Sequence, residues 1–411
     1  MSLPVSTVTP LHSRLRGRRV ICCVGSGGVG KTTTSAALAL RFAVEGRRAL
    51  VLTIDPARRL ANSLGLAQLG NRETPIDLAP LGARAVAPRG TLYAMMLDLK
   101  ATWDDLVHRE APSPERAQAI LDNRLYQTLS TAMAGSLEYM AMAKVAEVAS
   151  SGRYDVVVLD TPPTANALDF LKAPDRILDV LDNDAMRVLL GPMLRAGSVG
   201  LKLFALPSSL ILKTLSRFTG ADFLRDLATF MIAFEGMYDA FKARAAQVKS
   251  LLAGGESAFV LVTSPNPLAI DEALFFHRAL EAEGISTTAV VVNRVQRDPH
   301  RYGGSDAPAA LREALLAAQI KDAPRLSNLG GEGGPGAEGL LSDRLARTLA
   351  EQAMLADLDR REVERLAHTL GPVPLYTVPR LRRDVHDLAG LWQIDLNLED
   401  GEGGVDEKQQ I

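Results

Sequence analysis

Apolar residues along this chain follow two spacings, and the alternation of the two predicts its architecture. Short runs rich in β-branched residues predict strands, and stretches with apolar residues at helical spacing lie between them. The predicted strands cover residues 18–24, 48–54, 91–97, 154–160, 258–263, 288–293 and 374–378. Strands that alternate with helices are typical of a parallel sheet with helices on both faces. We therefore expect an α/β fold built on a mostly parallel, doubly wound sheet.

The section from 184 to 252 departs from this alternation, because it has no strand candidate and carries apolar residues at helical spacing. We interpret it as an inserted helical subdomain, and we expect a second helical patch at 103–150. A glycine-rich run predicts a flexible loop at 328–339, and the polar end of the chain predicts a disordered tail. The predicted division is an N-terminal extension at 1–17, a sheet domain in two parts at 18–183 and 253–398, the insertion at 184–252, and the tail at 399–411.

Composition narrows the class of protein. The chain has 411 residues, of which 47% are hydrophobic, so it can bury a large core. Its 46 basic residues nearly balance its 48 acidic ones, which argues against bulk attraction to nucleic acid or to an anionic membrane. The most apolar region is interrupted by Arg195, Lys202 and Lys213, so we expect no transmembrane segment. The only cysteines, Cys22 and Cys23, are neighbours that point to opposite faces of a predicted strand, which argues against a disulfide or metal site and favours the cytoplasm.

One loop carries the strongest chemical signal. Residues Gly25 to Thr32 match the pattern G-x-x-x-x-G-K-[ST], directly after a predicted strand and before a helical pattern. Glycines let such a loop curl so that its N–H groups converge on phosphate oxygens, and the following helix adds its positive end. Lys31 is expected to reach the β- and γ-phosphates and Thr32 to bind Mg²⁺. The predicted nucleotide contacts in this loop are Gly27, Gly28, Val29, Gly30, Lys31, Thr32 and Thr33.

Three further polar residues end predicted strands. Asp160 follows four apolar residues and has the form of a Walker-B carboxylate, which can hold Mg²⁺ through a water molecule. Asp55 could orient the attacking water, and Asn293 could contact the adenine edge. Each also has an ordinary interpretation, as a capping or turn residue. Because ligands in open α/β sheets bind beyond the carboxyl ends of the strands, we expect all three to meet the phosphate loop at one site.

These motifs together resemble the ArsA/GET family of deviant-Walker-A P-loop ATPases, which groups the arsenical-pump ATPase with the ATPase that delivers tail-anchored membrane proteins. The resemblance is carried by GSGGVGKTT, by DPARRL at Asp55 and DTPPTANALDFL at Asp160 as the two switches, by VVVNR, and by PLYTVPRLRRDVHDLAGL. It implies that the sheet domain is a P-loop ATPase domain that uses ATP and Mg²⁺. It also implies that Asp55 and Lys31 are catalytic, that Pro379 and Arg380 line the adenine pocket, and that two subunits face each other across ATP.

The sequence departs from the family pattern in its cations and thiols. Ser26 stands where the family has a signature lysine, and Arg58 and Arg59 replace its usual His-Ser pair. We hypothesise that one of these arginines, or a lysine from a paralogous partner subunit, replaces the missing charge; the alternative is that both are solvated surface charges. The chain has neither a C-x-x-C zinc pair nor spare thiols for an arsenical, which disfavours an arsenite pump.

The expected function is Mg²⁺-dependent ATP hydrolysis that drives conformational change in a dimer, with an apolar protein client as a further partner. Met186, Met193, Met231 and Met237 could form a client groove in the insertion, or simply a helical core or dimer contact. The alternatives are a slow nucleotide-gated protein-binding module, or a subunit of a heteromeric complex with a paralog. The sequence leaves the client, and the choice between homodimer and heterodimer, open.

Overall fold

The structure is a computed structural model that describes residues 9–55, 58–84, 86–132, 136–162, 226, 238–299 and 337–400. Its centre is an eight-stranded sheet in the order β3-β4-β2-β5-β1-β6-β7-β8. Every neighbouring pair is parallel except β3 and β4. The strands are β1 Val20–Val24, β2 Arg48–Thr53, β3 Thr74–Ile76, β4 Thr91–Met96, β5 Val156–Asp160, β6 Ser257–Thr263, β7 Thr287–Val295 and β8 Leu375–Pro379. The predicted α/β fold is confirmed, and each of the predicted strands is present.

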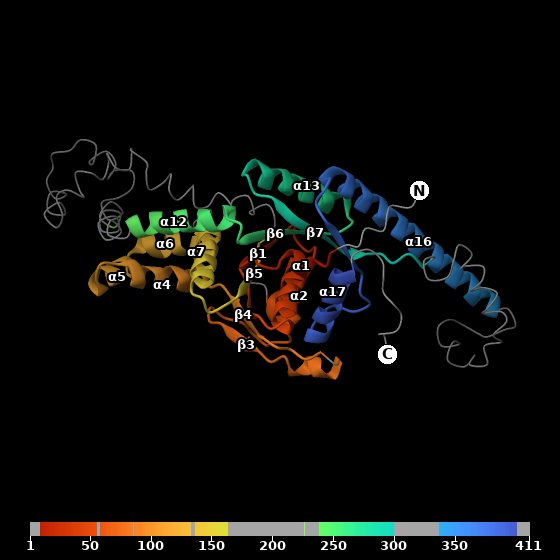
Figure 1. The fold of residues 1–411 in the computed structure, drawn as a ribbon, viewed down its shortest axis with the longest axis horizontal. Helices are drawn as coiled ribbons and strands as arrows, with labels where there is room; N and C mark the ends of the chain where they lie inside the picture. Colours follow the sequence, from red (N-terminus) through yellow and green to blue (C-terminus); the bar gives the residue numbers. More distant parts are fainter. Residues whose placement is uncertain are drawn as a thin grey trace.

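Helices cover both faces of the sheet, which explains why every residue of β1, β5 and β6 is buried. One core lies under α1 Leu11–Arg14, α2 Lys31–Val44, α3 Arg59–Ser63 and α17 Leu388–Asp400. The opposite core lies under α7 Ser136–Ser150, α12 Tyr238–Ala253, α13 Pro267–Ala282 and α16 Ala337–Leu370. Figure 1 shows α2 and α17 side by side across one face of the sheet.

The two adjacent cysteines of β1 point into different cores, as the alternation of a strand requires. Cys23 packs in the core under α2 and Cys22 in the core under α13, and both are fully buried. Burial raises the pKa of both thiols, that of Cys23 to about 12. A disulfide between neighbours that face opposite ways is excluded by this geometry, and both cysteines are free.

A smaller helical lobe extends from the sheet. It contains α4 Leu99–Glu110, α5 Pro114–Leu121, α6 Arg124–Ala132, α7 and the start of α12 (Figure 1). These helices share a third core, formed by Leu106, Val107, Ala117, Ile120, Tyr126, Met140, Ala143 and Ala245. The helical patch predicted at 103–150 is therefore present. No helix among the described residues is long and apolar enough to cross a membrane.

Three predicted boundaries meet the structure only in part. The insertion predicted at 184–252 lies mostly outside the described residues, as do Met186, Met193, Met231 and Met237, although α12 occupies its last fifteen positions. The loop predicted at 328–339 extends three residues too far, because α16 begins at Ala337. The tail predicted from 399 starts too early, since α17 continues to Asp400; residues 328–336 and 401–411 lie outside the described part of the chain.

The C-terminal helix α17 is fastened to α2 by a buried ion pair. Arg41 of α2 lies 2.7 Å from the Asp395 carboxylate, and its guanidinium lies 4.6 Å from the centre of the Trp392 ring. Both charged side chains are almost completely buried. Because α2 begins at the glycine-rich loop, this contact fixes the helix from which that loop emerges.

Candidate functional site

The glycine-rich loop joins the end of β1 to the first residue of α2, at the carboxyl edge of the sheet. Gly28 and Gly30 have φ values of 78° and 102°, a region that favours glycine. A side chain at Gly30 would also collide with the amide of Asn293, which lies against the loop. The loop is therefore built for glycine on grounds of both backbone angle and space, and its residues lead directly into the positive end of a 14-residue helix.

Lys31 folds back across this loop. Its amine donates hydrogen bonds to the carbonyl oxygens of Gly25 and Ser26, at 2.9 and 2.8 Å. The side chain is buried, and burial lowers its pKa against the opposing effect of Asp160 and Asp55. A phosphate oxygen is charged and is therefore a stronger acceptor for the Lys31 amine than these neutral carbonyls.

Asp160 accepts hydrogen bonds from two hydroxyl groups that belong to other elements. Thr32 of α2 and Thr53 of β2 both donate to its Oδ2, at 2.7 and 2.8 Å. Its second oxygen, Oδ1, is buried without a hydrogen-bond partner among the described residues. Burial raises the pKa of this carboxyl from 3.8 to about 6, although the two hydroxyls and Lys31 favour the charged form.

This arrangement fits a magnesium ion. Mg²⁺ prefers hard oxygen ligands and keeps several waters, so a threonine hydroxyl beside a carboxylate with one unused oxygen is a suitable donor set. A buried carboxylate that is costly to ionise in the apolar interior would be stabilised by a divalent cation. Thr32 and Asp160, the pair expected from the sequence, are thus the residues that could hold the metal, and metal binding stays a prediction.

Asp55 lies one strand away from Asp160, just beyond the end of β2. Its backbone N–H donates to the Thr53 hydroxyl at 3.2 Å, and its carboxylate lies 3.9 Å from the guanidinium of Arg59. Arg59 is mostly exposed, and its charge contributes to the lowered pKa of Lys31. Asp55 and Arg58 also line a cavity of 10 Å³, roughly the space that one water requires.

Ser26 contributes no charge to the loop. Its side chain is buried, and its hydroxyl has no hydrogen-bond partner within the described ranges. The position that the family pattern gives to a lysine therefore holds a small, neutral group, whereas the Arg59 guanidinium lies 3.9 Å from the Asp55 carboxylate.

The ends of β7 and β8 bring the remaining predicted residues to the same edge. Asn293 donates from Nδ2 to the carbonyl of Val29 at 2.9 Å, and its Oδ1 accepts from the Arg294 N–H at 2.9 Å. Both ends of the amide are thus engaged by the protein, and contact with adenine stays a prediction. Pro379 ends β8 and Arg380 follows it; the Arg380 N–H donates to the Val295 carbonyl at 2.8 Å.

Sequence reasoning missed two residues here. Thr53 ends β2 opposite Asp160 in the register of β2 and β5, and Arg294 donates from Nη1 to the carbonyl of Gly28 at 2.9 Å. Arg294 could have been noticed as the cation directly after Asn293. Nothing in the sequence marks Thr53, because its partner is 107 positions away.

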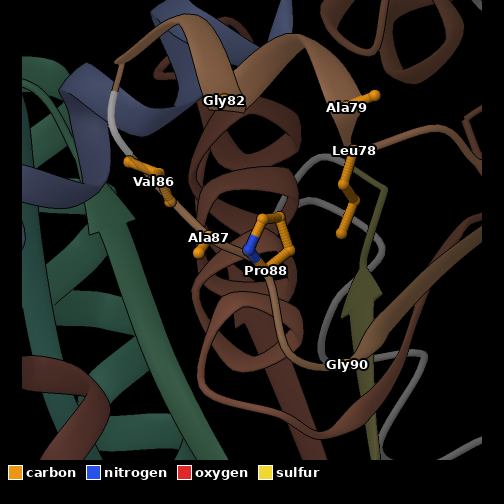
Figure 2. Close-up of a pocket in the computed structure, with 7 residues that line it drawn as sticks. All are labelled: Leu78, Ala79, Gly82, Val86, Ala87, Pro88 and Gly90. Atoms are coloured by element: carbon orange, nitrogen blue, oxygen red, sulfur yellow. The ribbon is translucent and has the colours of Figure 1, made fainter.

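A larger hollow of about 680 Å³ lies at the opposite edge of the sheet (Figure 2). It is lined by Leu78, Ala79, Gly82, Val86, Ala87, Pro88 and Gly90. Ala79 and Gly82 belong to η1 Ala79–Arg84, and Gly90 directly precedes β4, so the hollow lies at the amino ends of the parallel strands. None of these seven described residues is charged, and the hollow lies away from the carboxyl ends of the strands, where ligands of open α/β sheets bind.

Comparison with known proteins adds an independent finding. A family model described as "Anion-transporting ATPase" matches residues 18–305, which include the loop, Asp55, Asp160 and Asn293. A protein of Prosthecochloris vibrioformis named as an arsenical pump-driving ATPase is 36% identical over 159 residues, which are 39% of this chain and 36% of that protein.

Two fungal proteins give similar matches. ATPase get3 of Aspergillus terreus is 31% identical over 174 residues, or 42% of this chain and 48% of that protein. ATPase GET3 of Malassezia globosa is 32% identical over 176 residues, with the same two shares. The chain thus spans between about a third and a half of the length of these curated relatives.

Proposed function

This chain belongs to the family of anion-transporting ATPases, and from that premise we propose that it binds ATP with Mg²⁺ and hydrolyses it. The observation that carries the proposal is the contact of Asp160 with both Thr32 and Thr53. It joins the phosphate loop, the end of β2 and the end of β5 around one buried carboxylate. A phosphate loop and a metal-binding carboxylate at one point are what a nucleoside triphosphatase requires.

Each residue then has a defined task. The N–H groups of Gly27 to Thr33 bind the phosphates, and Lys31 exchanges its carbonyl partners for the β- and γ-phosphate oxygens. Thr32 would hold Mg²⁺ directly and Asp160 would hold it through water, and the metal would supply charge neutralisation at the phosphates. Asp55 orients the attacking water, while Pro379 and Arg380 face the base.

Arg59 is our candidate for the cation that Ser26 does not provide. Its guanidinium lies 3.9 Å from the Asp55 carboxylate, and its positive charge contributes to the lowered pKa of Lys31. A cation supplied at this point stabilises the charge that develops on the transferred phosphoryl group and is worth on the order of 10³-fold in rate. A lysine from a paralogous partner subunit would serve the same purpose, and addition of such a partner would then raise turnover.

The finer parts of the proposal rest on the family resemblance. We propose a cytoplasmic dimer, either a homodimer or a heterodimer with a paralog, in which the two switches respond to nucleotide and the helical insertion handles an apolar protein client. A slow, nucleotide-gated binding module is the second candidate, and the neutral Ser26 is the observation that favours it. The two differ in whether a client changes the steady-state turnover.

Phosphate release and nucleotide binding by calorimetry test the proposal together. We expect Asp55→Asn to keep its affinity for MgADP within about threefold and to lose at least about 100-fold in turnover, because only the water loses its partner. Lys31→Ala should lose nucleotide affinity itself. Asp105→Asn, on the exposed side of α4, is the control and should change neither quantity. Unchanged MgATP affinity in Lys31→Ala would refute the proposed function.

A further inference from the structure

β7 ends in a β-bulge at Arg294. The register with β8 pairs Asn293 with Val378 and Val295 with Pro379, which leaves Arg294 as the extra residue. Its φ of 63° makes it the one non-glycine with a positive φ among the described residues. Bulges redirect side chains, and an unfavourable backbone angle persists only where surrounding contacts hold it.

The bulge aims two consecutive side chains at two consecutive carbonyls of the phosphate loop. Asn293 Nδ2 donates to the Val29 oxygen and Arg294 Nη1 to the Gly28 oxygen, each at 2.9 Å. The Asn293 amide is held in turn by the Arg294 N–H, also at 2.9 Å. Asn293 is buried and Arg294 exposed, so one contact lies inside the protein and the other at its surface.

Because the peptide unit is planar, these two contacts also set the direction in which N–H groups of the loop point. In a trans peptide the C=O of one residue and the N–H of the next point in opposite directions. When the Gly28 and Val29 carbonyls are drawn towards β7, the N–H groups of Val29 and Gly30 must point away from β7. Those two N–H groups belong to the stretch that binds phosphate in a loop of this type. Gly28 and Gly30 supply the positive φ values that let the chain turn this way.

We propose that Asn293 and Arg294 are positioning residues that hold the phosphate loop with the Val29 and Gly30 N–H groups preset for phosphate. The inference rests on the proposed function and deepens it. It gives Asn293 a task that does not involve the base, because its amide donates to the Val29 carbonyl and accepts from the Arg294 N–H. It also explains why Gly30 leaves no room for a side chain: the Asn293 amide occupies that space.

Two variants separate this role from ordinary structural support. Arg294→Gly removes the guanidinium but adopts a positive φ without strain, so the melting temperature without nucleotide should be unchanged or higher. Asn293→Asp keeps the acceptor for the Arg294 N–H and loses the donor to Val29. For each variant we expect the Kd for MgADP to rise about tenfold, the effect of losing one preset hydrogen bond of this kind. Arg294→Lys, which keeps a cationic donor, should recover part of that loss.

MgGDP distinguishes loop positioning from base recognition. If Asn293 acts on the loop, Asn293→Asp weakens MgADP and MgGDP by the same factor, and the ratio of the two affinities stays at the wild-type value. A changed ratio would mean that the amide contacts the base and would overturn the assignment of Asn293. An unchanged Kd for MgADP in Arg294→Gly would overturn the assignment of Arg294 as a positioning residue.

A measurement without nucleotide keeps the inference separate from the ATPase proposal. In protein labelled with ¹⁵N-glycine, the amide signals of Gly28 and Gly30 should shift or broaden in Arg294→Gly and Asn293→Asp, while that of Gly284 stays in place. Loop signals that match the wild type in both variants would refute the inference, whether or not the wild-type protein binds MgATP. Perturbed loop signals in a protein that binds no nucleotide would leave the positioning role standing and would remove the ATPase.

Discussion

Replacing Asp160 with asparagine should remove a pH dependence from the stability of the magnesium-free protein. The pKa of this carboxyl rises from 3.8 in the unfolded chain to about 6 in the fold, chiefly because of burial. Folding therefore favours the protonated form, so the contribution of Asp160 to stability is fully present below about pH 4 and is lost as the pH rises through 6. The whole shift corresponds to about 3 kcal/mol, and about half of it falls between pH 5 and pH 8.

The assay is urea unfolding in EDTA at pH 5 and at pH 8. Relative to Asp160→Asn, the wild type should lose about 1.5 kcal/mol between these two pH values. The comparison across pH cancels the cost of the asparagine NH₂ beside Thr32 and Thr53, because that cost is present at both. Asp105→Asn provides the control for loss of an exposed carboxylate. With MgADP in place of EDTA the wild type should regain the loss, since bound metal stabilises the ionised form.

An equal change in the free energy of unfolding between pH 5 and pH 8 in the wild type and in Asp160→Asn would refute the reasoning. Such a result would mean that the Oδ1 atom is solvated, or that the hydrogen bonds from Thr32 and Thr53 outweigh its burial. The Asp160 carboxylate would then gain nothing from a divalent cation beyond ordinary surface attraction, and the argument for a metal at this point would lose its physical basis.

Two other predictions follow from the packing around α2. Gly30→Ala should weaken MgADP binding by at least about tenfold in calorimetry, because the new side chain collides with Asn293. Gly284→Ala, which also has a positive φ but lies in open space, should cost about 1 kcal/mol of stability and leave the affinity for MgADP unchanged. An equal loss of affinity in the two variants would contradict the collision with Asn293. Arg41→Met should lower the free energy of unfolding by about 3–5 kcal/mol, because it removes the cation that lies against the buried Asp395. A second change, Asp395→Leu, should restore most of that loss in the same urea titration. A double variant no more stable than Arg41→Met would contradict this explanation of the loss.

The sheet could be predicted from sequence because each central strand is buried on both faces and therefore reads as a continuous β-branched run. β3 could not, since a three-residue edge strand with Pro75 in its middle carries no such signal. The family resemblance, confirmed by the match over residues 18–305, rests on motifs that are local in the chain. Local motifs need no tertiary information to be read.

The rest of the site could not be predicted because it depends on register. Thr53 is one of many strand-ending threonines until β2 pairs with β5 and places it opposite Asp160. Arg294 reads as a surface cation until a bulge in β7 turns it towards Gly28. The sequence-based expectation for Asn293 concerned a base, whereas the contact that the fold displays is to the phosphate loop. The proposed roles of the site residues stay predictions until the variants are measured.

The placement of the two cysteines has a practical consequence for testing the proposed dimer. Because Cys22 and Cys23 are inaccessible and disfavour the thiolate, maleimide reagents should leave the native chain unlabelled. A single cysteine introduced at an exposed position such as Phe275 of α13 would then be the sole reactive thiol. Spin labels or fluorophores could be attached there without first mutating the strand that leads into the phosphate loop, and distances between two chains could be followed as nucleotide is exchanged.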